Sequence, residues 1–214
     1  MIRVRAYRFY VNIVIMSRII LASASPARKN LMKELKLAFS IHTSGFKENM
    51  NAYKNPSKLA KHLAQGKATS IAQKFPNCII IGADTFITVG IGRSLEKIGK
   101  PSTIKEAETI IKKMSAQTIA VHSGIAVIKT DPRGKISKKI VEHVVTKLTI
   151  KKMSSAEIHG LAHQKDALQI SGAFSIEGAG GKMIEKIDGD YNNVIGLPLF
   201  MLRKMLKKIG VKFG

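Results

Sequence analysis

The hydrophobic residues of the chain follow two alternating patterns: short continuous runs, and a spacing of three or four positions. Short continuous apolar runs, such as 19–21 and 78–81, are typical of strands that are buried on both faces of a sheet. Between such runs, apolar residues recur every three or four positions, most regularly over 59–72, which predicts an amphipathic helix. Other segments with helical spacing or helix-start signals are 26–37, 104–114, 154–162 and 195–209.

The order of these segments predicts an α/β fold, because strands and helices alternate along most of the chain. Two longer β-rich segments, 119–130 and 139–148, flank the turn residues 131–134 and therefore predict a hairpin. Further strands are expected over 39–42 and 86–89. With 214 residues, 45% of them hydrophobic, the chain can bury one core, so we expect a single domain.

The charge balance indicates which kinds of partner the chain could bind. The chain has 36 Lys and Arg residues against 14 Asp and Glu, which gives a formal net charge of +22. Such a field attracts polyanions, whether nucleic acid, anionic membranes or phosphorylated metabolites. The basic residues are spread along the whole chain, and with 6% aromatic residues and no Trp a base-stacking platform is poorly supplied. Specific nucleic-acid binding is therefore not expected.

The N-terminal region needs a separate interpretation. Three arginines precede the apolar stretch 9–16, as in a secretory signal, but Asn12 interrupts that stretch. We expect Met16 to be the natural start, with residues 1–15 an extension or the product of an upstream start, and 16–214 the domain. No stretch approaches the roughly 20 apolar residues of a membrane-spanning helix. The single cysteine, Cys78, allows no internal disulfide, and we expect a cytoplasmic protein.

Three local motifs could contact phosphate or a metal ion. Small residues over 21–25 lead into a helix start at Pro26, where backbone N–H groups and Arg28 could bind phosphate. Asp84 directly follows a buried strand, a place suited to metal binding or base catalysis. Lys100 lies between a Gly and a Pro that could present its charge. Taken singly, each motif is also explained by a capped helix, an Asx-turn or a Pro-terminated turn.

These motifs occur together in the order found in one known family. The chain resembles the Maf, or septum-formation-inhibitor-like, nucleotide pyrophosphatases over about residues 18–206. The matching segments are LASASPARKNLMKEL at 21–35, IIIGADTFITV at 79–89, GKP at 99–101, SGAFSIEG at 171–178 and GDYNNVIGLPL at 189–199. The resemblance implies a single α/β domain, similar to ITPase, in which helices flank a curved mixed sheet. It also implies an active-site cleft between two lobes, and a homodimer.

The resemblance also assigns roles to residues. The family's carboxylates fall on Glu48 and Asp84, which would share Mg²⁺, or another divalent cation such as Mn²⁺, with Asp84 as the base that activates water. Its phosphate-binding groups fall on Ser23, Arg28, Lys67 and Lys100. The activity implied is hydrolysis of a nucleoside triphosphate to a monophosphate and pyrophosphate, with a role in removing unwanted, and in some cases modified, nucleotides.

Three positions bear on which base is bound. Relatives that act on dTTP and UTP pair an Arg, a Thr and a Gln at positions that here hold Ala27, Thr85 and Glu177. Glutamine matches the alternating donors and acceptors of uracil, whereas an ionised glutamate only accepts. We therefore expect Glu177 to favour bases with N–H donors, such as guanine, 7-methylguanine or cytosine.

Two other interpretations remain open from the sequence. The net charge of +22 would suit a nucleic-acid-binding protein without catalysis, whose affinity would fall steeply with salt. The older family name suggests a regulator of cell division that acts by binding alone. Other patterns point to no site: His159 and His163 stand four residues apart, but Gly160 occupies the place where a zinc protease carries its glutamate, so surface histidines are the simpler interpretation.

Overall fold

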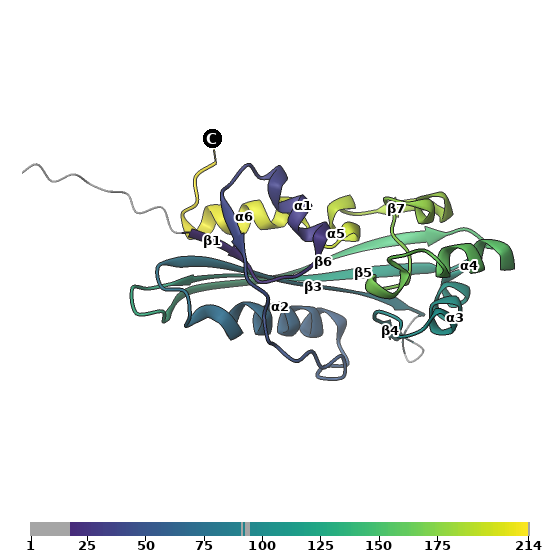
Figure 1. Ribbon diagram of the computed structural model, residues 1–214, viewed down its shortest axis with the longest axis horizontal. Helices are drawn as coiled ribbons and strands as arrows, with labels where there is room; N and C mark the ends of the chain where they lie inside the picture. Colours follow the sequence, from purple (N-terminus) through teal and green to yellow (C-terminus); the bar gives the residue numbers. More distant parts are fainter. Residues whose placement is uncertain (1–17, 91, 93–94, 214) are drawn as a thin grey trace, which may run out of the picture.

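A seven-stranded mixed sheet extends along the molecule, with helices on both of its faces (Figure 1). This computed structural model describes residues 18–90, 92 and 95–213, so the predicted extension over 1–15 lies outside the described residues. The strands are β1 (Arg18–Leu21), β2 (Phe39–Ile41), β3 (Cys78–Val89), β4 (Glu96–Ile98), β5 (Thr118–Thr130), β6 (Ile136–Ile150) and β7 (Ile184–Asp188). The prediction of one α/β domain with a mixed sheet flanked by helices is confirmed.

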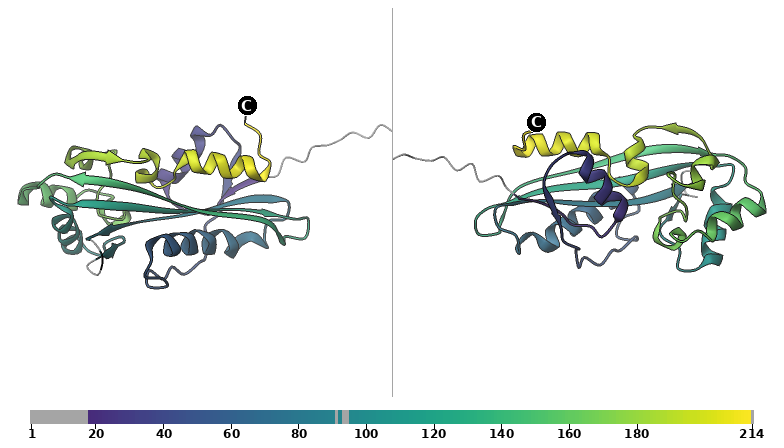
Figure 2. Two further views of the ribbon diagram at one scale, coloured as in Figure 1. Left: turned by 180° about the vertical axis from the view of Figure 1, so that it is seen from behind. Right: turned by 45° about the horizontal axis from the view of Figure 1, so that its top comes forward.

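Six α-helices accompany the sheet within the described residues. They are α1 (Pro26–Glu34), α2 (Pro56–Ala72), α3 (Ile104–Met114), α4 (Ser155–Ala162), α5 (Tyr191–Ile195) and α6 (Leu199–Ile209), joined by the short 3₁₀ helices η2 (Ala167–Gln169) and η3 (Ala179–Met183). Helix α2 covers one face of the sheet, while α1, α5 and α6 lie on the other (Figures 1 and 2). Helices α3 and α4 lie together at one end, beside β4.

Strand β3 is central to the sheet, and its residues alternate between two cores. Ile79 and Ile81 pack with residues of α1 and α6, whereas Cys78 and Ile80 pack with alanines of α2. Strand β3 is therefore buried on both faces, which explains its continuous apolar sequence. The same alternation directs the side chains of Asp84 and Thr85, further along β3, to opposite faces of the sheet.

One edge of β3 is only partly paired. Strand β1 pairs in parallel with 78–81, and β4 pairs antiparallel with 87–89. The other edge of β3 pairs continuously with β5 over 79–88. Among the described strands, none pairs with 82–86 on the first edge, so the sheet has a gap there, directly beside Asp84 and Thr85. This gap positions the candidate site.

Helix α2 approaches the sheet closely because glycine stands at two positions beneath it. A Cβ atom on Gly124 would lie 1.9 Å from the carbonyl oxygen of Ala60, and one on Gly82 would lie 2.3 Å from that of Ala64. Neither strand residue could therefore carry a larger side chain without moving α2. The close contact brings the side chains of α2 within reach of β3.

Several element boundaries differ from those that the sequence pattern predicts. The apolar run 78–81 and the segment 86–89 form one continuous strand, so Asp84 lies within β3 and does not follow its end. Helix α1 ends at Glu34, before the expected Leu37, because the chain turns at Lys36 with a φ of 52°. The single C-terminal helix expected over 195–209 is two helices, divided at Gly196, whose φ is 125°, and at Pro198. The short strands β4 and β7 carry no strong alternation and were not expected.

Candidate active site

A cavity of about 510 Å³ lies at the gap in the sheet. Its walls come from α1, α2 and β3, from the segment around Lys100, and from the loop 169–177. The loop is held to the gap by two hydrogen bonds: Ser171 Oγ donates to the carbonyl oxygen of Thr85 at 3.2 Å, and Gly172 N donates to that of Gly99 at 3.2 Å. The cavity thus joins segments far apart in the sequence, in line with the predicted cleft between two lobes.

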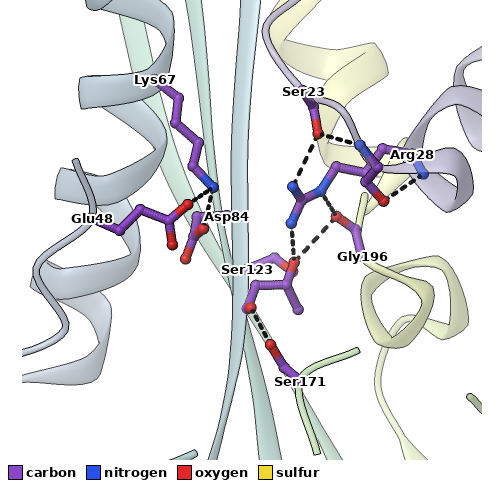
Figure 3. A network of polar contacts seen from close by, with 10 residues as sticks. Ser23, Arg28, Glu48, Lys67, Asp84, Ser123, Ser171 and Gly196 are labelled. Atoms are coloured by element: carbon purple, nitrogen blue, oxygen red, sulfur yellow. Dashed lines mark hydrogen bonds and ion pairs between the residues drawn. The ribbon is translucent and has the colours of Figure 1, made fainter. Parts of the chain in front are cut away.

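One side of the cavity holds a lysine between two carboxylates. Lys67 Nζ lies 2.8 Å from Glu48 Oε1 and 2.5 Å from Asp84 Oδ1 (Figure 3). Helix α2 directs Lys67 toward the middle of β3, where Asp84 lies, while Glu48 comes from the segment between β2 and α2. The Lys67 and Asp84 side chains are 11% and 6% exposed, against 47% for Glu48, so the cluster is open to solvent only on the Glu48 side.

The other side of the cavity is organised around Arg28, at the first turn of α1. Its guanidinium donates from Nε to the carbonyl oxygen of Gly196 at 2.9 Å, from Nη1 to Ser23 Oγ at 3.2 Å, and from Nη2 to Thr85 Oγ1 at 3.2 Å (Figure 3). Burial lowers the pKa of Arg28, while the charges of Asp84 and of Glu48 raise it. Arg28 therefore ties together α1, β3 and the end of α5 as a half-buried cation.

Thr85 completes this network. Its Oγ1 lies 2.7 Å from Ser123 Oγ and donates to the carbonyl oxygen of Gly196 at 3.2 Å, in addition to its contact with Arg28. Ser123 stands directly opposite Thr85 on β5 and is fully buried. A hydroxyl with one proton and two lone pairs is saturated by these three contacts. The Thr85 side chain therefore holds Arg28 in place.

Comparison with known proteins identifies the family. A family model described as "Maf-like protein" matches residues 18–209. This chain belongs to the Maf-like family. A "dTTP/UTP pyrophosphatase" from Methanosarcina barkeri (strain Fusaro) is 38% identical over 198 residues, which cover 92% of this chain and 96% of that protein. A "dTTP/UTP pyrophosphatase" from Bacillus thuringiensis subsp. konkukian is 33% identical over 196 residues, covering 92% and 97%. The predicted resemblance, and with it the prediction of an enzyme of the nucleotide pyrophosphatase class, is confirmed.

Among solved structures, a HAM1 protein from Coxiella burnetii aligns with 90% of this chain and 100% of its own, at a TM-score of 0.48 and 15% identity. That likeness is too distant to bear on the chemistry of the site.

The structure brings the residues predicted from the sequence of this Maf-like protein to one place. The cavity is lined by eight of them, Ala27, Arg28, Glu48, Lys67, Asp84, Thr85, Lys100 and Glu177. The ninth, Ser23, does not line it but contacts it through Arg28, and its Oγ also accepts from Ser25 N at 3.2 Å. Lys100 and Glu177 are exposed at the rim. The lysines and the acid pair thus come together from four separate segments of the chain.

Three residues of the site were not identified from the sequence. Ser123 and Ser171 contact Thr85, and the carbonyl oxygen of Gly196 accepts from Arg28. A lone serine within a strand carries no local signal, and a backbone carbonyl carries none at all. Only the pairing of β3 with β5 brings Ser123 to Thr85.

No described helix combines the length and the apolar content that a membrane crossing requires.

Proposed function

We propose that this chain hydrolyses the α–β phosphoanhydride of a nucleoside triphosphate and releases a nucleoside monophosphate and pyrophosphate. The observation that carries the proposal is the cluster in which Lys67 contacts both Glu48 and Asp84, in a cavity that also holds Lys100. Carboxylates facing cations in one cavity suit a reaction in which water attacks a phosphorus atom and an anion leaves. The names of the relatives at 38% and 33% identity support the same reaction.

The two carboxylates fit a hard divalent cation such as Mg²⁺, or Mn²⁺ in its place. They approach the same ammonium group to within 2.8 and 2.5 Å, so both can face one positive centre. All the side-chain ligands they offer are oxygen atoms, and the exposed side of Glu48 leaves room for water and phosphate oxygens. Bound to Glu48 and Asp84, such a cation would neutralise charge on the phosphates.

The side chains of the cavity have separate roles in the proposed reaction. Asp84 is the proposed base: buried in the middle of β3, beside the unpaired part of its edge, its carboxylate accepts a proton from the attacking water. Lys67 holds that carboxylate in place and adds positive charge where negative charge develops on pyrophosphate. Lys100, exposed at the rim, supplies a second cation for the leaving group. Arg28 adds its charge from within the wall rather than as a mobile clamp, because three of its N–H groups already bind protein oxygens.

The names of the relatives make dTTP and UTP the first candidate substrates. The second candidate class comes from Glu177, which lines the cavity as an exposed carboxylate. An ionised carboxylate cannot donate to a uracil carbonyl oxygen, whereas it accepts from the N–H groups of guanine, 7-methylguanine or cytosine. Comparing kcat/KM for these triphosphates in the wild type and in Glu177→Gln separates the two: a shift toward UTP in the variant supports a role for Glu177 in base selection. Equal selectivity in the wild type and in the variant would exclude a role for Glu177 in base selection.

The test of the reaction is product identification after incubation with a panel of ordinary and modified triphosphates and Mg²⁺. Pyrophosphate and a monophosphate are expected. Orthophosphate with a diphosphate, or no turnover of any triphosphate, would overturn the proposal. Turnover of modified triphosphates in preference to ordinary ones would support a role in removing damaged nucleotides.

The remaining proposals concern the oligomeric state and the cellular location of the protein. A cytoplasmic homodimer follows the family pattern, and light scattering of the purified chain tests the dimer. If triphosphate hydrolysis is absent while salt-sensitive binding to DNA or RNA is strong, the noncatalytic alternative suggested by the charge of +22 gains support. A division regulator that acts by binding alone would likewise keep its effect in Asp84→Asn.

A further inference from the structure

A cluster of metal-binding side chains lies outside the cavity, where α3 and α4 meet. Glu108 comes from α3, while His159 lies in α4 and His163 is its C-cap residue. One ligand atom from each residue lies within 4.8 Å of the other two. The two helices are fixed against each other by a shared core that includes Ile111 and Leu161. The three side chains are therefore brought together by the fold and not only by their spacing in the sequence.

We infer that Glu108, His159 and His163 form a binding site for a divalent transition-metal ion, with Zn²⁺ as the representative ion. Residues four apart on a helix lie on the same face, and the imidazole rings of His159 and His163 have their centroids 3.9 Å apart. Glu108 Oε1 lies 2.9 Å from His159 Nδ1. Bond lengths of about 2.0–2.2 Å to nitrogen and oxygen can be reached from this arrangement by small side-chain rotations.

The backbone orients one of the ligands. His163 Nδ1 lies 2.9 Å from the carbonyl oxygen of His159, and since a carbonyl only accepts, Nδ1 carries the proton. The lone pair of neutral His163 is then on Nε2, free to bind a metal. Metal-binding histidines generally donate their other nitrogen to a carbonyl or carboxylate in this way.

The donor set determines which ion is bound. Two imidazoles and one carboxylate suit Zn²⁺ and similar ions, whereas Mg²⁺ prefers oxygen ligands alone. The site therefore differs in kind from the pair Glu48 and Asp84. The His159 side chain is 66% exposed and that of Glu108 36%, so an ion can enter from solvent and keep water as a further ligand. The net charge of +22 opposes entry of a cation, but at physiological salt it is largely screened beyond about 8 Å.

The cluster of Glu108, His159 and His163 lies next to the segment that leads into the cavity wall. Directly after His163 the chain runs through η2 into the loop 169–177, which forms one wall of the cavity. An ion bound to both α3 and α4 would fix the start of this wall. It would also stabilise the folded chain, because the unfolded chain does not hold the three ligands together.

The test is equilibrium dialysis of the untagged full-length chain against Zn²⁺ at pH 7.5, with millimolar Mg²⁺ present to compete for oxygen-only sites. One saturable zinc ion per chain is expected. His159→Gln, His163→Gln and Glu108→Gln should each weaken binding at least about tenfold, as the loss of even an outer-shell partner costs roughly 10–100-fold. His42→Gln is the matched control, since His42 is exposed and packs on Phe75 instead.

Two further readouts follow from the same proteins. Zinc should raise the melting temperature of the wild type by several degrees, and of His42→Gln equally, but not of the three ligand variants. Co²⁺ should give the intense visible absorption of a four-coordinate ion. No saturable binding, or equal affinity in the wild type and His163→Gln, would overturn the site. Unchanged affinity in Glu108→Gln would overturn its assignment as a three-residue site that bridges the helices.

Discussion

The close approach of α2 to the sheet can be tested by adding a single methyl group. Gly124 stands directly opposite Asp84 in the pairing of β5 with β3. In Gly124→Ala the new Cβ would lie 1.9 Å from the carbonyl oxygen and 2.3 Å from the carbonyl carbon of Ala60, both backbone atoms that cannot rotate away. Because nonbonded Cβ contacts shorter than 3.0 Å essentially do not occur, α2 must move outward by roughly 1 Å.

That movement has two measurable effects. Overpacking of this kind costs about 1–3 kcal/mol, which for a chain of this size lowers the melting temperature by roughly 2–12 °C. A 1 Å outward shift also stretches the contact from Lys67 Nζ to Asp84 Oδ1, now 2.5 Å, to the limit of a hydrogen bond. Misplacement of a catalytic group by about 1 Å can reduce the rate roughly a hundredfold. We therefore expect Gly124→Ala to lose most of its kcat/KM while remaining folded.

The assay is the steady-state release of pyrophosphate together with scanning calorimetry. Gly160→Ala is the matched control, because a Cβ at that exposed position in α4 meets nothing within 4 Å. Its activity should be unchanged and its melting temperature slightly raised, since Ala is favoured over Gly in a helix by about 1 kcal/mol. If Gly124→Ala has wild-type stability and activity, the packing of α2 against β5 does not position Lys67, and the reasoning fails.

Three further predictions concern the site and its surroundings. Asp84→Asn and Glu48→Gln should each keep the fold and lose on the order of a hundredfold or more in kcat, measured by pyrophosphate release at saturating Mg²⁺; near-wild-type turnover of Asp84→Asn would disprove the mechanism. Thr85→Val removes the hydroxyl that holds Arg28 and should raise KM more than it lowers kcat, which a KM unaffected by the change would contradict. Burial, with His143 adding to it, lowers the pKa of His122 to about 4, below the roughly 6.5 of an unfolded chain. The unfolded state therefore binds the proton more readily than the folded state. The contribution of His122 to the free energy of unfolding is complete above pH 6.5. It falls by about 2 kcal/mol, after allowance for partial solvation, as the pH drops to 4. Acid unfolding curves that keep the same slope in His122→Gln would show that this group is not responsible.

The sequence determined the elements whose formation depends on local residues. Ser25 and Pro26 fix where α1 begins, because the serine side chain caps the first turn and proline fits its start. The apolar run from Cys78 predicts a strand wherever a sheet can cover it. The ordered motifs that gave the family could likewise be read from the chain alone. The position of Asp84 within β3, instead of after the strand, could not.

Other local signals were weaker or misleading. The helical spacing over 195–209 continues across Gly196, although a left-handed residue there divides the segment into two helices. The short strands β4 and β7 exist because β3 and β6 offer edges for pairing, which is a property of the sheet and not of the strands' own sequences.

Only the tertiary structure decided how the site is built. The gap in the edge of β3 depends on where β1 ends and β4 begins, and pairings over such distances are set by the packing of the whole sheet. The contacts of Arg28 with Thr85 and Gly196 join residues 57 and 168 positions apart. Periodicity describes which side chains are buried, but it holds no information about which distant partner a buried polar group will meet. That partner is chosen by the close packing of α1, β3 and α5.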